Sequence, residues 1–359
     1  MRTRPAPKPK PARIGDPRPL VLIVDDSAVA RAVLARAVES DGRFLVAGAV
    51  SSAAVALEFV KHTRVDGIVL DLEMPGVSGL AALPGLIAAG QGAKVLIVSS
   101  AASEGAAATV EALALGAADT LVKPDIGEFA GRFSIALNEK LTRLLTTDDA
   151  QALPSRSGAG VGEPGVAPGF DIVAIGASTG GIHALSLLLR EIPKDFTVPI
   201  LITQHLPESF MPYFAAQIAV LANRPCDVAT DCMRIRPGRV IVAPGNAHIR
   251  VVSTGDGGAI RLTADPAKSG CMPSVDPMFE SLAEVYGSRV LGVVLSGMGR
   301  DGSDGARSVQ SHGGTVVVQD RESSVVWGMP GAIANTGGAS AVLAPREIGR
   351  LIAARRRPA

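Results

Sequence analysis

The chain has 359 residues, a formal net charge of +1, 47% hydrophobic residues and 3% aromatic residues. This length is sufficient for two domains, each with a core of its own. A net charge this close to zero argues against a chain whose overall field attracts nucleic acid or an anionic membrane.

Residues 1–19 form a basic, proline-rich tail without the apolar stretch of a secretory signal. No apolar run approaches the length of a membrane span, so we expect no membrane insertion. The three cysteines, Cys226, Cys232 and Cys271, match no zinc-binding spacing and leave an odd number for disulfides. The chain is therefore predicted to be cytoplasmic, with its cysteines reduced.

Residues 20–145 alternate short apolar runs with helical patterns. Strands are predicted at 20–24, 44–50, 67–70, 94–98 and 120–122, and the first helix is predicted at 27–40. Five successive strand–helix units predict a flavodoxin-like domain with a five-stranded parallel sheet.

Polar side chains stand at the ends of four of these strands. Asp25 and Asp26 follow the first strand, Asp71 the third, Ser99 the fourth and Lys123 the fifth. Carboxylates that converge repel one another unless a cation neutralises them, and Mg²⁺ prefers oxygen ligands. Taken singly, Asp26 or the next serine could cap the first helix and Lys123 could be a surface cation. Their joint placement favours a metal and phosphoryl site.

This set resembles the response-regulator receiver family over roughly residues 20–145. The resemblance implies that Asp71 accepts a phosphoryl group from a histidine kinase, in a Mg²⁺ site that Asp25 and Asp26 complete. It implies that Ser99 and Lys123 contact the phosphoryl group. Receivers usually carry an aromatic residue where this chain has Thr120.

Residues 146–169 are rich in Asp, Pro, Ser and Gly, and such a stretch cannot bury a core. They are predicted to be a flexible linker. The second domain, a larger doubly wound α/β domain, is predicted to span residues 170–356.

An apolar run at 171–175 leads into a Gly-x-Ser-x-Gly turn that contains Ser178. Such a turn lifts a serine hydroxyl above the sheet, although Ser178 could instead only cap the next helix. Two more apolar runs end close to His205 and Asp301. Sites form at the carboxyl ends of parallel strands, so these three residues are candidates for a nucleophile, a base and an orienting carboxylate. The chain order Ser, His, Asp differs from that of α/β-hydrolases, which indicates another fold.

Other histidines compete for the role of the base. His183 follows Ser178 closely on the predicted helix and is the strongest rival, and His248 ends a Pro-Gly loop that could line the site. We favour His205 because it directly follows a strand.

The second domain resembles the chemotaxis protein-glutamate methylesterase (CheB) family. The motifs that carry the resemblance are IGASTGG (175–181), QHLP (204–207), SGMGRDG (296–302), VAPGNAH (242–248), PSVD (273–276) and GMP (328–330). It implies that Ser178, His205 and Asp301 form a catalytic triad and that the backbone N–H of Met298 stabilises the oxyanion.

The same resemblance implies a two-component response regulator that demethylates glutamate methyl esters on chemoreceptors and deamidates receptor glutamines. Phosphorylation of Asp71 by a cognate histidine kinase would activate it. The esterase step would need no cofactor.

Two other classes of output domain fit the sequence less well. In a nucleotide-binding module, Gly176–Gly181 would hold phosphate at a helix N-terminus, but the Gly-x-Gly-x-x-Gly spacing and a Walker lysine are missing. For a DNA-binding output, no basic recognition helix stands out. We therefore expect no nucleic-acid partner.

Overall fold

The computed structural model describes residues 16–99, 103–123, 131–146, 169–255 and 257–355. The chain divides into two compact units, Met1–Thr147 and Asp148–Ala359. The predicted tail 1–19 and linker 146–169 lie almost entirely outside the described residues, so their character stays a prediction.

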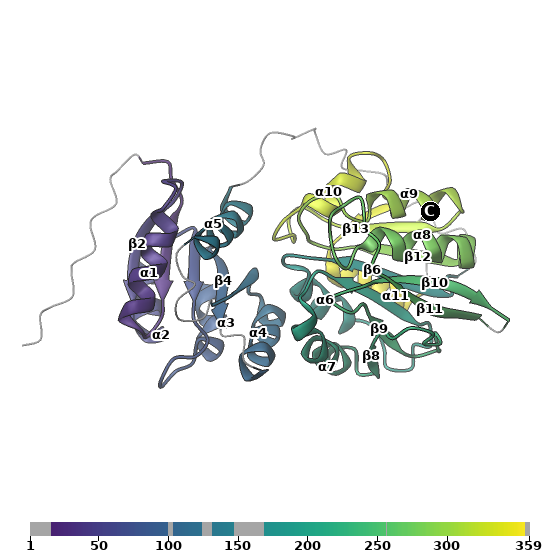
Figure 1. The fold of residues 1–359 in the computed structure, drawn as a ribbon, viewed down its shortest axis with the longest axis horizontal. Coiled ribbons are helices and arrows are strands. Elements are labelled where there is room, and N and C mark those ends of the chain that lie inside the picture. Colours follow the sequence, from purple (N-terminus) through teal and green to yellow (C-terminus); the bar gives the residue numbers. More distant parts are fainter. Residues whose placement is uncertain (1–15, 100–102, 124–130, 147–168, 256, 356–359) are drawn as a thin grey trace, which may run out of the picture. The chain divides into compact units, whose positions relative to one another are not determined.

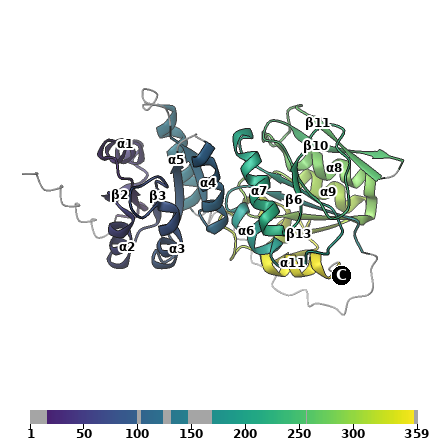
Figure 2. The same ribbon diagram turned by 90° about the horizontal axis from the view of Figure 1, so that it is seen from below.

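The first unit is a five-stranded parallel sheet with helices on both faces (Figure 1 and Figure 2). Its elements are β1 (Leu20–Val24), α1 (Ala28–Glu39), β2 (Leu45–Val50), α2 (Ala53–His62), β3 (Gly67–Leu70), α3 (Gly79–Ala89), β4 (Lys94–Ser99), α4 (Ser103–Leu115), β5 (Asp119–Val122) and α5 (Arg132–Leu145). The strand order β2-β1-β3-β4-β5 is that of flavodoxin, which confirms the predicted fold.

Serine side chains fix where three of these helices begin. The hydroxyls of Ser27, Ser52 and Ser78 each accept a hydrogen bond from the backbone N–H three residues later. Such caps satisfy N–H groups that the first turn of a helix leaves unpaired. Because Ser27 caps α1, the Asp26 side chain is not needed for that role.

The second unit is built on a seven-stranded parallel sheet. Its elements are β6 (Ile172–Ala177), α6 (Gly181–Leu189), β7 (Ile200–Gln204), the 3₁₀ turn η2 (Glu208–Phe210), α7 (Met211–Ala222), β8 (Cys226–Val228), β9 (Val240–Val242), β10 (His248–Thr254), β11 (Gly257–Thr263), α8 (Val275–Tyr286), the 3₁₀ turn η3 (Gly287–Arg289), β12 (Val290–Val294), α9 (Ser303–Ser311), β13 (Thr315–Gln319), α10 (Gly328–Ala334), β14 (Ala341–Leu343) and α11 (Pro345–Ala353). The strand order is β14-β13-β12-β6-β7-β9-β8. From β6 the chain builds the sheet outward on one side and later returns to build the other side. This confirms the doubly wound α/β architecture and puts its topological switch point between β6 and β12.

The antiparallel hairpin of β10 and β11 lies outside this sheet and was not predicted from the sequence. Its apolar side chains, including Ile249, Val251 and Ile260, share a core with Phe279 and Leu282 of α8. The hairpin leads into the loop before α8, and that loop reaches the carboxyl ends of the sheet strands.

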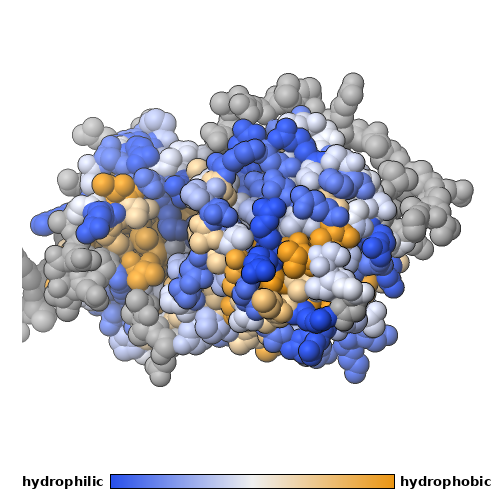
Figure 3. Space-filling model, turned by 45° about the vertical axis from the view of Figure 1, so that its right-hand side comes forward, coloured by the Kyte–Doolittle hydropathy of each residue, from blue (hydrophilic) through white to orange (hydrophobic). Residues whose placement is uncertain are grey.

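Within the described ranges, no helix combines the length and apolar character needed to cross a bilayer. Figure 3 shows a face that is mostly hydrophilic, with smaller apolar areas between the polar ones.

Candidate functional site

The turn after β6 holds Ser178 at the switch point of the second unit. The Ser178 backbone N–H donates to Ser296 O at 3.0 Å, and its carbonyl accepts from Gly181 N at 2.8 Å and Gln204 Nε2 at 3.0 Å. The N-cap of α6 is Gly180, with a left-handed φ of 76°. Ser178 is therefore not the cap of this helix, and the simple capping explanation of its presence is wrong.

His205 and Asp301 come together from the ends of two strands that flank β6. β6 pairs with β7 on one side and β12 on the other, so the segments that follow these strands meet at one edge. His205 Nε2 lies 2.8 Å from Asp301 Oδ2. Asp301 is 2% exposed, whereas the His205 side chain retains 17% of its exposure. The imidazole thus pairs with a buried carboxylate and remains reachable from solvent.

The Asp301 carboxylate is held by two further donors. Ser274 Oγ donates to Oδ1 at 2.6 Å, and the backbone N–H of Val275 donates to Oδ2 at 2.8 Å. Burial alone would raise the pKa of Asp301, but the hydrogen bonds from His205, Ser274 and Val275 outweigh it and hold the pKa low. Asp301 is therefore a fixed negative charge beside the imidazole.

The thiol of Cys271 is a neighbour of His205 that the sequence did not predict. Burial by itself lowers the pKa of His205, but hydrogen bonds with Asp301 and Cys271 raise it to about 9. Ligand atoms of His205, Cys271 and Asp301 all lie within 4.8 Å of one another. The three cysteines are free thiols in this structure.

The Ser178 side chain lies close to the turn after β12. A Cβ added to Gly297 would lie 2.8 Å from Ser178 Cβ and 2.3 Å from Met329 Sδ, so only glycine fits there. Among the described residues, no hydrogen bond joins the Ser178 hydroxyl to His205, and that contact stays a prediction. Met298 is 44% exposed beside this turn, and its part in an oxyanion site also stays a prediction.

The two rival histidines have other surroundings. His183 lies on α6, whereas the carboxylate of Asp301 is paired with His205. His248 is buried; its Nε2 lies 2.8 Å from Asp265 O, and its Nδ1 accepts from Ser274 N at 2.8 Å. His248 therefore positions the loop whose serine holds Asp301.

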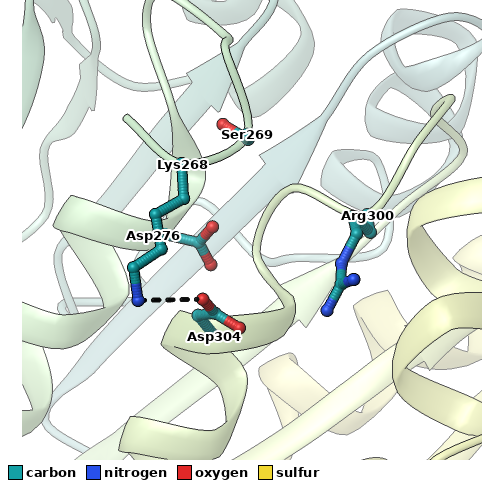
Figure 4. Close-up of a pocket in the computed structure, with 5 residues that line it drawn as sticks. All are labelled: Lys268, Ser269, Asp276, Arg300 and Asp304. Carbon is teal, nitrogen blue, oxygen red and sulfur yellow. Dashed lines mark ion pairs between the residues drawn. The ribbon is translucent and has the colours of Figure 1, made fainter. Parts of the chain in front are cut away.

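A charged pocket of about 250 Å³ adjoins this region. Lys268 and Ser269 come from the loop before α8, Asp276 from α8, Arg300 from the turn before α9, and Asp304 from the first turn of α9 (Figure 4). Lys268 Nζ lies 3.5 Å from Asp304 Oδ2. Burial and the negative charge of the nearby Asp301 carboxylate raise the pKa of Asp276. The pocket suits polar or charged groups.

In the first unit, the carboxylates of Asp25, Asp26 and Asp71 lie within 4.8 Å of one another. Lys123 Nζ lies 2.6 Å from Asp71 Oδ2 and 3.0 Å from Asp25 Oδ2. Asp25 and Asp71 are buried, whereas Asp26 is exposed and opens the cluster to solvent. Burial raises the pKa of Asp71, and the ion pair with Lys123 only partly opposes this. Such a crowded oxygen cluster fits a hard divalent cation such as Mg²⁺.

Ser99 stands apart from this cluster in its hydrogen bonding. Its buried hydroxyl lies 2.7 Å from Thr109 Oγ1, and Thr109 Oγ1 donates to Gly105 O at 2.6 Å. Thr120 is buried on β5, and its hydroxyl has no partner among the described residues. Residues 100–102 of the loop after β4 lie outside the described part of the chain.

Family profiles match both units. The CheB methylesterase profile matches residues 173–352, and the response regulator receiver domain profile matches residues 21–131. A protein-glutamate methylesterase/protein-glutamine glutaminase 2 of Caulobacter vibrioides is 42% identical over 94% of this chain and 99% of its own length. A protein-glutamate methylesterase/protein-glutamine glutaminase of Rhodospirillum centenum is 39% identical over 94% of each chain.

A solved structure agrees with these matches for the second unit. The Thermotoga maritima CheB methylesterase catalytic domain is 34% identical and superposes with a TM-score of 0.50. The alignment covers 52% of this chain and 98% of that domain.

Proposed function

Since this chain belongs to the CheB methylesterase family, we propose that Ser178, His205 and Asp301 are the catalytic triad with which it demethylates glutamates on chemoreceptors. One observation carries the assignment of the residues: His205 is paired with buried Asp301 beside the turn that presents Ser178. An imidazole held in this way matches the base of a serine hydrolase.

In the proposed reaction, Ser178 Oγ attacks the ester carbonyl while His205 accepts the hydroxyl proton. The negative charge of the tetrahedral intermediate develops near the backbone N–H of Met298. His205 then gives the proton to the departing methoxide, so methanol leaves. Water, deprotonated by His205, attacks the acyl-enzyme, and the glutamate and the serine hydroxyl are released.

Deamidation of receptor glutamine uses the same steps, with ammonia in place of methanol. The relatives' names include both activities, which supports this second reaction. In the proposed reactions these side chains, the backbone and one water molecule carry out every step, without a cofactor.

We propose that the first unit controls this activity through a phosphoryl group on Asp71, donated by a histidine kinase. Asp25, Asp26 and Asp71 would hold Mg²⁺, which neutralises the acidic cluster and the incoming phosphoryl oxygens. Lys123 already pairs with Asp71 and would remain beside the phosphoryl group. The cytoplasm is the proposed site of action, in line with the three free thiols.

Methanol release from methylated receptor membranes tests the triad. Ser178→Ala should abolish release, whereas Ser253→Ala, which changes an exposed serine on β10, should leave it unchanged. Near-normal release by a folded Ser178→Ala protein would overturn the assignment of the nucleophile.

The same assay with acetyl phosphate and Mg²⁺ tests the control by phosphorylation. The wild type should be activated, and Asp71→Asn should not respond because it has no carboxylate to accept the phosphoryl group. Asp41→Asn, an exposed change on the same unit, should respond as the wild type does. Equal activation of Asp71→Asn and the wild type would remove Asp71 from this role.

A further inference from the structure

Cys271 lies beside the His205–Asp301 pair but has no part in the proposed hydrolysis. Ligand atoms of Cys271, His205 and Asp301 all lie within 4.8 Å of one another, and the Cys271 thiol donates to Ser269 O at 3.9 Å. Cys271 is only half-buried, so a solute can reach it. Imidazole, thiol and carboxylate together are a set of groups that binds transition metals.

The spacing of this group is close to what a tetrahedral metal site requires. Zinc bonds of about 2.0–2.3 Å place neighbouring ligand atoms about 3.5 Å apart. His205 Nε2 and Asp301 Oδ2 are already 2.8 Å apart. Cys271 is on a loop, where its N–H donates to Ser269 Oγ at 3.3 Å, and this loop can adjust more easily than the buried carboxylate.

We propose that His205, Cys271 and Asp301 form a site for Zn²⁺ or a similar thiophilic cation, and that the bound cation reversibly inhibits the esterase. Three protein ligands leave the fourth position of the metal to water.

The bound cation inhibits the esterase because it occupies the lone pair of the His205 imidazole. The Cys271 thiol releases its proton, and a nitrogen of His205 gives its lone pair to the cation. That imidazole can no longer serve as the base for Ser178. Because the ligands must lose protons, the apparent affinity for the cation should increase with pH.

The acidic cluster of the first unit has a different preference. Asp25, Asp26 and Asp71 offer oxygen ligands alone, which suit Mg²⁺, whereas a thiolate favours softer metals. Excess Mg²⁺ therefore keeps the acidic cluster occupied while the second site is measured.

Cobalt is the probe for binding, because a cobalt–thiolate bond has a charge-transfer absorption that oxygen and nitrogen ligands do not produce. The full chain, in excess Mg²⁺, is titrated with Co²⁺ and then with Zn²⁺. The wild type and Cys232→Ser, which changes an exposed cysteine, should both develop the band and lose it to Zn²⁺. Cys271→Ser and Cys271→Ala should not develop it.

Inhibition is measured separately as methanol release, each variant relative to its own rate without Zn²⁺. This arm rests on the proposed esterase function, whereas the cobalt band does not. We expect Zn²⁺ to inhibit the wild type and Cys232→Ser alike, a chelator to restore the rate, and at least a tenfold higher half-inhibiting concentration for Cys271→Ser.

A missing cobalt band in the wild type, or a band that persists in both Cys271 variants, would overturn the site. A band without inhibition by Zn²⁺ would overturn the regulatory half of the proposal. A chain that releases no methanol under any condition would refute the proposed function instead, and the cobalt titration would still decide whether the site exists.

Discussion

Asp301→Asn is expected to be a mild change in this protein, for reasons given by the hydrogen bonds around the carboxylate. Oδ2 accepts from the backbone N–H of Val275 and faces His205 Nε2, whereas Oδ1 accepts from the Ser274 hydroxyl. A backbone N–H can only donate, but a hydroxyl can turn and accept. The asparagine should therefore put its oxygen toward Val275 and His205 and its NH₂ toward Ser274.

In this orientation the imidazole keeps its tautomer and position and loses only the full charge of its partner. A hydrogen bond to a charged group contributes about 1.5–3 kcal/mol, against about 0.5–1.5 kcal/mol for a neutral pair. The difference of about 1–2 kcal/mol corresponds to a loss of roughly 5- to 30-fold in kcat/KM. Asp301→Ala removes the acceptor altogether, and a loss on the order of 10⁴-fold is expected, as when a triad imidazole takes the wrong tautomer.

Methanol release by wild type, Asp301→Asn and Asp301→Ala measures the two losses, with circular dichroism to check that each variant is folded. Ser274→Ala supplies a further comparison, because without that hydroxyl the asparagine NH₂ has no acceptor. The loss caused by Asp301→Asn should then be larger in the Ser274→Ala background than alone. An Asp301→Asn protein as inactive as Asp301→Ala would refute the reasoning about orientation.

Three further outcomes follow from other contacts. Because the pKa of His205 is raised to about 9, little of its imidazole is neutral at pH 7. The value of kcat/KM for methanol release should therefore rise with pH and level off above about pH 9. A kcat/KM that does not change between pH 7 and pH 9 would contradict this expectation. Thr120→Val removes a buried hydroxyl that has no hydrogen-bond partner among the described residues. The free energy of unfolding of the first unit, measured in urea, should increase by about 1 kcal/mol. A decrease would show that the hydroxyl has a hydrogen-bond partner. Gly297→Ala places a methyl group against Met329 and Ser178 and should lower kcat/KM by at least about 10²-fold. A wild-type value of kcat/KM would show that the turn can shift to accommodate the methyl group.

Much of the sheet could be predicted because its strands are buried runs of Val, Ile and Leu bounded by polar residues. β1 and β3 begin and end where the sequence predicts, and β4 extends one residue further, to Ser99. Parallel strands present their carboxyl ends at one edge, so a polar residue directly after each strand is enough to predict where it lies. The position of His205, directly after β7, was predictable for this reason, whereas Asp301 reaches the same edge from the turn between β12 and α9.

Residues that reach the site from outside the sheet could not be predicted in this way. Cys271 and Ser274 lie on the loop before α8, and its path depends on how the β10–β11 hairpin packs against that helix. His248 is a rival base by sequence, but its hydrogen bonds to Asp265 O and Ser274 N position that loop instead. Neither periodicity nor spacing in the sequence indicates how the hairpin packs against α8, although Ser274–Asp276 of the PSVD motif lie where α8 begins.

The bond between Ser99 and Thr109 has a consequence for the level of unstimulated signalling. Thr109 Oγ1 uses its proton on Gly105 O, so Ser99 is the donor between the two hydroxyls. If Ser99 contacts the phosphoryl group, as the resemblance to receiver domains implies, it must first give up this bond of about 1 kcal/mol. That amount biases a two-state equilibrium about fivefold toward rest. Under that condition, threonine rather than valine at position 109 of α4 would set a threshold that lowers background output and makes the response to weak phosphorylation less sensitive.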